Sequence, residues 1–387
     1  MKPEQFVPAQ RRHLVRAEGG SRAFVPPPLP PEVASSIDLM RRLSAADRAL
    51  GELAGAGREL PNPHLMSRAL LRREAVLSSR IEGTQASLSD LVLFEVSGDD
   101  GERSDVREVH NYLLAVDHVL DPDRRLPLSV SLLAEAHQIL LTGVRGGYAA
   151  PGEFRKSQNW IGAPGVVIDT AMYVPPPPER LWECLDSLEK QLHAKHALPP
   201  LLTIAALHYQ FEAIHPFIDG NGRVGRLMVI LLLIEWGLLP TPLLDLSSYI
   251  EPRRDRYYEG LLRVSTDGDW TGWFEFFLEA VEAQARDALG RARRLHVLRE
   301  QMRGDVATAK SSALPALLVD ALFDVPVLTI PRARTVLDVT HRAATMHVER
   351  LVALGILTEV GRGRRPRTFI AHGILRVATE AAGPSSH

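Results

Sequence analysis

The stretch HPFIDGNGRVGR, from His215 to Arg226, places an imidazole, a carboxylate, an amide, three glycines and two arginines within twelve residues. It lies between two apolar segments, 201–214 and 227–236, which lack turn-forming residues and therefore predict helices. A glycine-rich turn that opens a helix exposes backbone N–H groups at the positive end of the helix dipole, where phosphate oxygens bind. The stretch predicts a nucleotide site between two helices of a mainly α-helical protein.

Several residues of this stretch suit a polyphosphate. Gly220, Asn221 and Gly222 would form the turn whose N–H groups converge on phosphate oxygens. Arg223 and Arg226 add charged donors that can contact phosphate in a bidentate manner. The predicted second helix therefore begins at an anion site.

Asp219 and His215 add chemical groups to the predicted site. Magnesium prefers one or two carboxylates together with phosphate oxygens, so Asp219, directly before the turn, is a candidate ligand for an ion that bridges phosphates. His215 titrates near neutral pH and is a candidate base for a hydroxyl nucleophile.

Other interpretations of the stretch are less favoured. Residues 220–225 spell G-x-G-x-x-G, but the dinucleotide fingerprint needs a preceding strand, and 201–214 predicts a helix. No Lys-Ser/Thr pair follows the last glycine, which excludes a Walker loop. His208 and His215 could share a helix face and bind a metal, but no third ligand has a suitable spacing. A purely structural glycine turn would leave the His, Asp and Asn of the stretch without a role.

The stretch resembles the signature of the Fic family, H-x-F-x-D/E-G-N-G-R-x-x-R, at every specified position. The resemblance implies an all-α core that binds ATP with magnesium and transfers AMP to a hydroxyl side chain of a protein. It implies that His215 deprotonates the hydroxyl, that Asp219 holds the magnesium, and that Phe217 fixes the loop against the core. Arg223 would contact the β-phosphate and Arg226 the γ-phosphate. The residues expected to bind ATP are Gly220, Asn221, Gly222, Arg223, Val224, Gly225, Arg226 and Tyr258.

A second motif lies at the end of the helix predicted from Pro63 to about Glu82. Glu82 is followed by Gly83, a natural helix stop, so its carboxylate faces the negative end of the dipole. That position is unfavourable unless a cation lies opposite; the alternative is a solvated glutamate. Ser78 to Gly83 resembles the S/T-x-x-x-E-G/N inhibitory helix of Fic proteins. The resemblance implies that Glu82, supported by Ser78, pairs with Arg226 and blocks the γ-phosphate site.

The composition sets broad limits. A chain of 387 residues predicts two or three domains, and a net charge of −2 gives no global signal for nucleic acid or membrane. The single cysteine, Cys184, cannot form an internal disulfide and suits a reducing compartment. The longest apolar run, 227–234, is too short to cross a membrane, and the start of the chain does not resemble a signal peptide. We expect a soluble cytoplasmic protein.

We predict three regions along the chain. Residues 1–100 would form an N-terminal arm and a helical region that carries the inhibitory helix, and residues 101–300 the catalytic core. The proline run 26–31 predicts an extended polyproline arm, with binding to an aromatic groove as an alternative. Helices are expected at 36–54, 63–82, from 104 onward, and at 129–141, 181–193, 201–214, 227–236 and 270–298.

Residues 157–178 have a different composition and predict a short β-hairpin. Its strands would be Val166–Ile168 and Ala171–Val174, joined by Asp169 and Thr170. By resemblance this hairpin is the flap that covers the site and aligns the target segment by main-chain pairing, with Met172, Tyr173 and Val174 as the contact residues. The alternative is a structural hairpin away from the site.

Residues 311–380 predict a small separate unit. Helices at 314–322, 330–337 and 343–354 precede strands at 355–360 and 368–370, with the basic loop 361–367 between the strands. This order resembles a winged helix-turn-helix with the loop as its wing. Local positive charge fits DNA phosphates, although such modules also serve in protein contacts or dimerisation. A homodimer is a further expectation from the family.

The adenine base needs an apolar or aromatic wall, and Tyr249, Tyr257 and Tyr258 follow the motif in a helix-forming segment. We name Tyr258 as the candidate; core packing is the alternative for each tyrosine.

Two functional hypotheses of different class remain. The first is a self-inhibited transferase that moves AMP from ATP to a Ser, Thr or Tyr hydroxyl of a target protein or of itself. The second is a nucleotide-sensing, DNA-binding regulator, which would not need the base His215. Within the enzyme class, transfer of another nucleotide and removal of AMP from a modified protein, with Glu82 acting on a water, both stay open.

Overall fold

The computed structural model describes residues 1–33, 36–59, 63–97, 104–124, 127–144, 150–163, 165–195, 197–307, 314–360 and 367–379. Helices make up most of these residues, which confirms the predicted mainly α class. The helices before the C-terminal unit are α1 (Pro8–Arg11), α2 (Ile37–Glu59), α3 (Pro63–Ile81), α4 (Leu88–Ser97), α5 (Ser104–Val119), α6 (Val130–Leu141), α7 (Pro178–His193), α8 (Pro200–Ile214), α9 (Asn221–Glu235), α10 (Ser247–Ile250), α11 (Arg254–Asp267) and α12 (Trp270–Ala307).

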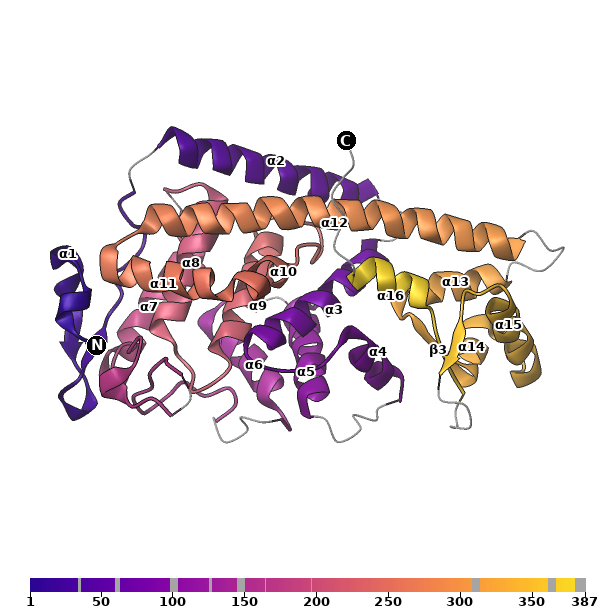
Figure 1. Cartoon of the computed structure of the whole chain (residues 1–387), viewed down its shortest axis with the longest axis horizontal. Helices are drawn as coiled ribbons and strands as arrows, with labels where there is room; N and C mark the ends of the chain where they lie inside the picture. The colour runs from indigo at the N-terminus through magenta and orange to yellow at the C-terminus, as the bar shows by residue number, and fades with distance from the viewer. Residues whose placement is uncertain are drawn as a thin grey trace.

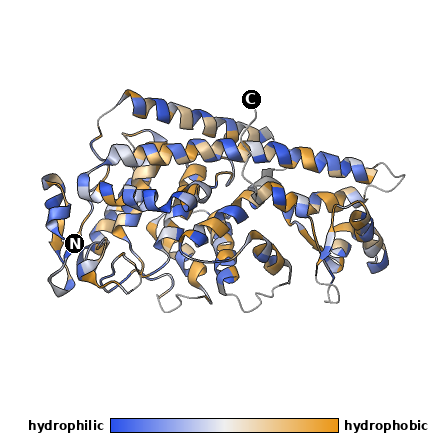
Figure 2. Ribbon diagram, in the orientation of Figure 1, coloured by the Kyte–Doolittle hydropathy of each residue, from blue (hydrophilic) through white to orange (hydrophobic). Residues whose placement is uncertain are grey.

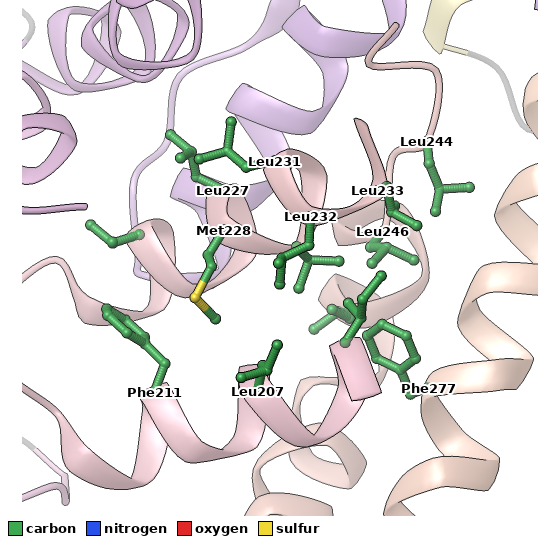
Figure 3. Packing of buried hydrophobic residues seen from close by; sticks show 14 of the residues in the cluster. Leu207, Phe211, Leu227, Met228, Leu231, Leu232, Leu233, Leu244, Leu246 and Phe277 are labelled. Atoms are coloured by element: carbon green, nitrogen blue, oxygen red, sulfur yellow. The ribbon is translucent and has the colours of Figure 1, made fainter. Parts of the chain in front are cut away.

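Helices α8 and α9 form the centre of the molecule. Both are apolar on nearly all sides, and nearly all of their residues are buried, as expected of a helix with no polar face. Figure 3 shows Leu207 and Phe211 of α8 facing Met228 and Leu232 of α9. Because this pair is held on all sides, the loop that joins α8 to α9 has a fixed position.

Two long helices cover one side of this centre. Figure 1 shows α2 lying along α12, and Figure 2 shows hydrophilic and hydrophobic residues alternating along both. Such alternation is typical of a helix with one face on a core. Helix α12 runs to Ala307, beyond the predicted end at 298, and its second half packs against the C-terminal unit.

The N-terminal arm contains a hairpin that the sequence analysis did not predict, and the proline run 26–31 follows it without helix or strand. Strands β1 (Leu14–Arg16) and β2 (Arg22–Phe24) form an antiparallel hairpin. The N–H of Phe24 donates to the carbonyl of Val174 at 2.9 Å, so the arm lies against the segment predicted as the flap.

The predicted flap has another pairing than expected. Val166–Ile168 is not a strand: Ile168–Thr170 is a 3₁₀ helix, and Ile161 pairs with Tyr173 in a single antiparallel bridge. The N–H groups of Thr170 and Ala171 donate to carbonyls three residues earlier, which replaces cross-strand hydrogen bonds. The exposed side chain of Val167 gains no packing that would favour a strand there.

The C-terminal unit has the order α13 (Leu314–Asp324), β3 (Val327–Thr329), α14 (Ile330–Leu337), α15 (His341–Ala353), β4 (Thr358–Val360), β5 (Thr368–Ile370) and α16 (His372–Thr379). Its antiparallel sheet has the order β3-β5-β4. The described helices and strands include those expected of a winged helix-turn-helix, with β3 and α16 in addition, and this assignment stays a prediction. Residues 361–366 of the expected wing lie outside the described residues.

The described helices include none that is both long and apolar enough to span a membrane.

Candidate functional site

The loop between α8 and α9 is closed by its own amide side chain. Asn221 accepts a hydrogen bond from the N–H of Phe217 at 2.9 Å and donates one to the carbonyl of Phe217 at 2.8 Å. Its side chain therefore does not cap α9, whose N-cap is Gly220 in a left-handed conformation (φ 78°). The first N–H groups of a helix have no partner within it, so α9 begins with donors available to an anion.

Phe217 holds this loop in the core, as predicted. It is fully buried and stacks on His137 of α6 with the ring centroids 3.8 Å apart. His137 accepts from the N–H of Gly152 at its Nδ1, so its Nε2–H must donate to the carbonyl of Asp219, 3.0 Å away. Burial lowers the pKa of His137 to about 4, which keeps this neutral tautomer. A Cβ on Gly220 would lie 3.3 Å from the His137 ring, so the turn fits glycine.

The structure places His215 at the C-cap of α8, in a left-handed conformation (φ 49°). Its Nδ1 lies 3.3 Å from the carbonyl of Glu212, and a carbonyl only accepts, so the proton is on Nδ1 and the lone pair on Nε2. Burial lowers the pKa of His215 to about 4, so the ring is neutral near pH 7. Arg155 fixes the turn by donating from Nε to the carbonyl of His215 at 2.9 Å.

The structure brings Glu82, Ser78 and Arg226 together. Nη2 of Arg226 donates to Oε1 of Glu82 at 2.7 Å and to the Ser78 carbonyl at 2.9 Å, and Nε donates to the Ser78 hydroxyl at 2.9 Å. Burial alone would raise the pKa of Glu82, but Arg226 outweighs it and holds that pKa below its ordinary value. A Cβ on Gly222 would overlap Glu82, so the close approach of α3 to α9 requires glycine.

Arg223 and Asp219 lie on the other side of the loop. Arg223 is buried and pairs with Glu108 of α5 at 3.3 Å, while its Nη2 is 3.9 Å from Oδ1 of Asp219. About half of the Asp219 side chain is exposed, and its Oδ1 also accepts from the N–H of Gly220 at 2.6 Å. A single accessible carboxylate beside an anion site suits magnesium, which takes its other ligands from phosphate and water.

A cavity of about 610 Å³ adjoins Glu82, His215 and Arg226, whereas Asp219 and Arg223 do not line it. Its lining also includes Gly222 and apolar and aromatic residues of α8, α11 and the flap: Tyr173, Tyr209, Ala213, Tyr257, Tyr258, Leu261 and Leu262.

Not all predicted site residues reach this cavity: of the motif, His215, Gly222 and Arg226 line it, and Asp219, Gly220, Asn221, Arg223, Val224 and Gly225 do not. Tyr258, Met172 and Tyr173 line it, but Val174 does not; it is fully buried. Tyr249 also lies elsewhere, donating to Glu279 at 3.1 Å. His208, considered as a metal ligand with His215, instead contacts the Gly225 carbonyl and the Tyr257 hydroxyl through its two ring nitrogens.

Glu212 is a site residue that the sequence analysis missed. It lines the cavity one helical turn before His215, and its Oε1 is buried with no hydrogen-bond partner among the residues that the structure describes. Burial raises its pKa to about 8. The spacing of Glu212 and His215 on one helix face was the available signal. His137 and Glu108 acquire their roles through contacts distant in sequence and had no comparable signal.

The pKa of Glu212 predicts a change in the pH dependence of stability. A carboxyl whose folded pKa is raised stabilises the protein below its unfolded pKa of about 4.5, and this contribution is lost as pH rises through about 8. The variant Glu212→Gln has no such group. We expect the slope of its unfolding free energy between pH 5 and 8 to differ from wild type by up to about 1.4 kcal/mol per pH unit. Denaturant unfolding at several pH values measures this, and parallel curves would contradict it.

Comparison with known proteins gives two family matches. Residues 40–121 match the model described as Fic/DOC family N-terminal, and residues 127–233 match the model described as Fic/DOC family. The protein adenylyltransferase Fic of Drosophila yakuba is 28% identical over 260 residues, which are 64% of this chain and 46% of that protein. The protein of the same name from Drosophila persimilis is 28% identical over 270 residues, 65% of this chain and 47% of that protein. The chain thus spans about half the length of these curated relatives.

Two solved structures share the fold. A Fic family protein from Desulfovibrio desulfuricans G20 superposes with a TM-score of 0.56 at 20% identity, over 89% of this chain and 98% of that chain. Fic-1 from C. elegans superposes with a TM-score of 0.52 at 21% identity, over 67% of this chain and 74% of that chain.

Proposed function

Because the chain belongs to the Fic/DOC family, we propose that it transfers AMP from ATP to a hydroxyl side chain of a protein and that its own Glu82 holds it inactive. The observation that carries the proposal is the contact of Glu82 with Arg226 at 2.7 Å, beside a neutral His215 and the free N-terminus of α9. A carboxylate on Arg226 takes the place that a terminal phosphate would need.

The proposed reaction uses the chain's groups in the following way. Nε2 of His215 accepts the proton of the target hydroxyl, and the hydroxyl oxygen forms a bond to the α-phosphorus. The bond from that phosphorus to the bridging oxygen breaks, and pyrophosphate leaves. The N-terminus of α9, Arg223 and Arg226 bind the negative charge that develops on the leaving group. Asp219 would hold magnesium, which neutralises phosphate charge when bound.

One assay tests the proposal: transfer of labelled AMP from ATP with magnesium, into the protein itself and into added proteins, by wild type, Glu82→Gly and Glu82→Gly/His215→Ala. Labelling that is strong only in the single variant supports both the activity and the inhibition. If ATP binds normally but none of the proteins is labelled, transfer of another nucleotide or removal of AMP becomes the better proposal.

Arg226 provides a more specific test of nucleotide binding. In the Glu82→Gly background, Arg226→Ala leaves no buried charge unpaired at this position, and it removes the proposed partner of the γ-phosphate. We expect ATP to bind about 10- to 100-fold more weakly, from the loss of charge-assisted hydrogen bonds. Because AMP lacks the γ-phosphate, its affinity should be unchanged. Calorimetry with both nucleotides measures the difference, and equal losses for ATP and AMP would count against this role.

The C-terminal unit supports a second candidate function, DNA binding. The side chains of His341, Arg342 and Met346 on α15 are exposed, as is Arg334 on α14. A helix that presents such residues can enter a DNA groove. Arg367, at the end of the predicted wing, pairs instead with Glu359 at 2.8 Å. If the unit binds DNA, Arg342→Ala should weaken duplex binding in a mobility-shift assay and reduce its salt dependence. Homodimer formation and a cytoplasmic location stay predictions.

A further inference from the structure

Glu212 lines the cavity together with His215 and Arg226. It lies on α8, with Ala213 on the apolar wall after it and His215 one turn further on. Its carboxyl packs over Gly225 of α9, where a Cβ would overlap Oε1. Gly225 precedes Arg226, so Glu212 stands close to the arginine of the proposed phosphate site.

The carboxyl of Glu212 has no structural partner to account for it. Within the described part of the chain, its Oε1 is buried and makes no hydrogen bond. Leaving a buried polar group unpaired is costly, and native proteins rarely do so unless a ligand or water completes the pairing. Glu74, a buried carboxyl elsewhere in the core, shows the contrast, because Ser247 donates to it from both its N–H and its hydroxyl.

The position of Glu212 relative to His215 suits the ribose of a nucleotide. An attacking oxygen bound to His215 must lie about 3–3.5 Å from the α-phosphorus. Glu212 is three residues away on the same helix, about 4.5 Å along its axis. The ribose is the group joined directly to the α-phosphate, on the side away from the β- and γ-phosphates. A ribose at Glu212 lets the base reach Tyr257 and Tyr258, which line the same cavity.

We propose that Glu212 binds a ribose hydroxyl of the nucleotide and thereby orients the α-phosphate towards His215. This inference rests on the proposed function. A carboxyl group suits a ribose hydroxyl because it can accept the hydroxyl proton, and in its neutral form it can also donate its own. The raised pKa agrees with this, since a neutral acid beside a polyphosphate avoids charge repulsion.

Deoxynucleotides provide the test. Calorimetry measures the affinity of ATP, 2′-deoxy-ATP and 3′-deoxy-ATP for Glu82→Gly protein, and for the same protein with Glu212→Ala or Glu212→Gln. We expect the Glu82→Gly protein to bind one deoxy analogue about five- to tenfold more weakly than ATP, the effect of one hydrogen bond. Glu212→Ala should bind ATP and that analogue equally, whereas Glu212→Gln, which keeps donor and acceptor, should retain most of the preference. Thermal unfolding checks that each variant is folded.

The other outcomes each overturn a distinct claim. If Glu212→Ala weakens all three nucleotides by the same factor, Glu212 acts on another group, such as Arg226, and the ribose assignment is wrong. If the Glu82→Gly protein itself shows no preference among the three, the assignment is also wrong, while the proposed function stands. If that protein binds no ATP at all, both fail.

Different contacts carry a second inference, on the control of Glu82. Figure 1 shows α3 between the central helices and the C-terminal unit. Arg72 of α3 is buried and donates to the carbonyl of Asp324, the last residue of α13, at 2.6 Å, and to Glu95 of α4 at 2.8 Å. The next residue, Arg73, shares Asp287 with Arg291, which donates to two carbonyls of α16.

We infer that the C-terminal unit holds α3 in its inhibitory position, so that displacement of this unit by a partner loosens Glu82. A helix transmits such a displacement because it is stiff over the ten residues from Arg72 to Glu82, about 15 Å. The inference concerns the regulation of the proposed inhibitory residue, Glu82, and rests on the proposed function for its effect on AMP transfer. The contacts of α3 with α13 and α16 exist whether or not the protein is a transferase.

Two arginines of α3 serve for the test. The buried Arg72 contacts the C-terminal unit, whereas Arg68 forms a more exposed ion pair with Asp117 of α5 at 2.9 Å, away from that unit. In the full chain, we expect Arg72→Ala to increase amide hydrogen exchange at residues 78–82 at least about fivefold, a loss of about one hydrogen bond. Arg68→Ala should leave exchange there unchanged, and Glu95→Gln should have an intermediate effect. Exchange at 78–82 that is equal in Arg72→Ala and Arg68→Ala would overturn the inference. Faster exchange without any rise in AMP transfer would instead count against the proposed function.

Discussion

Replacing Glu82 with glycine is expected to raise AMP transfer from ATP by about 10- to 100-fold, because this is the factor that a charge-assisted hydrogen bond of about 1.5–3 kcal/mol corresponds to. In the wild-type structure, Arg226 is occupied by Glu82 and by Ser78, and both Arg226 and Glu82 line the cavity. A γ-phosphate must displace the carboxylate before it can bind Arg226. The glycine variant removes that competition.

The same substitution should lower the stability of the free protein. Arg226 is buried, and Glu82 raises its pKa; without this carboxylate the guanidinium keeps only the neutral oxygens of Ser78. Removing one partner of a buried ion pair costs about 3–5 kcal/mol, less here because Glu82 is about one-third exposed. ATP should therefore raise the melting temperature of Glu82→Gly more than that of wild type. This readout does not depend on transfer.

A matched variant separates charge from shape. Glu82→Gln retains the length of the side chain and a hydrogen-bond acceptor for Arg226, but not the charge. Its transfer rate should lie between wild type and Glu82→Gly. If Glu82→Gly and Glu82→Gln both transfer AMP at the wild-type rate while ATP binds, Glu82 does not inhibit.

The sequence was most informative where function depends on residues close together in the chain. The loop from His215 to Arg226 has its own internal hydrogen bonds, such as those of Asn221 to Phe217, so its local pattern determines most of its geometry. The helices were predictable for the same reason, since their apolar periodicity is local. The contact of Glu82 with Arg226 spans 144 positions and was predicted only through the family resemblance.

Prediction failed where long-range pairing decides the structure. Strand β3 exists because Val327–Thr329 pairs with β5, forty residues later in the chain, and three residues carry too little pattern to reveal this. In the flap, Tyr173 pairs with Ile161 rather than with a nearer strand. Glu108 could not be assigned because nothing in its helix indicates the buried Arg223 that it meets.

Replacing His215 with alanine in the Glu82→Gly background is expected to lower AMP transfer by about 10²- to 10⁴-fold, the usual contribution of a positioned general base. The geometry supports this size of effect. The Glu212 carbonyl holds the proton on Nδ1, so Nε2 presents its lone pair, and His215 itself lines the cavity. ATP affinity should change little, because the proposed phosphate contacts are made by α9 and the arginines.

The backbone at His215 requires a second variant. Its φ of 49° lies in the left-handed region, which disfavours alanine but is tolerated by asparagine. His215→Asn therefore removes the base at less cost to the loop. The hydrogen bond from Arg155 to His215 goes to the backbone carbonyl of His215, so both variants keep that anchor. Transfer should be lost in both, and loss in alanine alone would point to loop distortion.

The lowered pKa of His215 provides a test that distinguishes a general base from a purely structural residue. Because burial lowers that pKa to about 4, the neutral base is present throughout the range from pH 5 to 8. In the Glu82→Gly protein, kcat/KM should therefore fall on the acid side with an apparent pKa near 4, well below the ordinary value of about 6.5. Rates measured from pH 4 to 8, with unfolding followed at each pH, give this profile. An acid limb near 6.5, or one that survives in His215→Asn, would assign the base to another group.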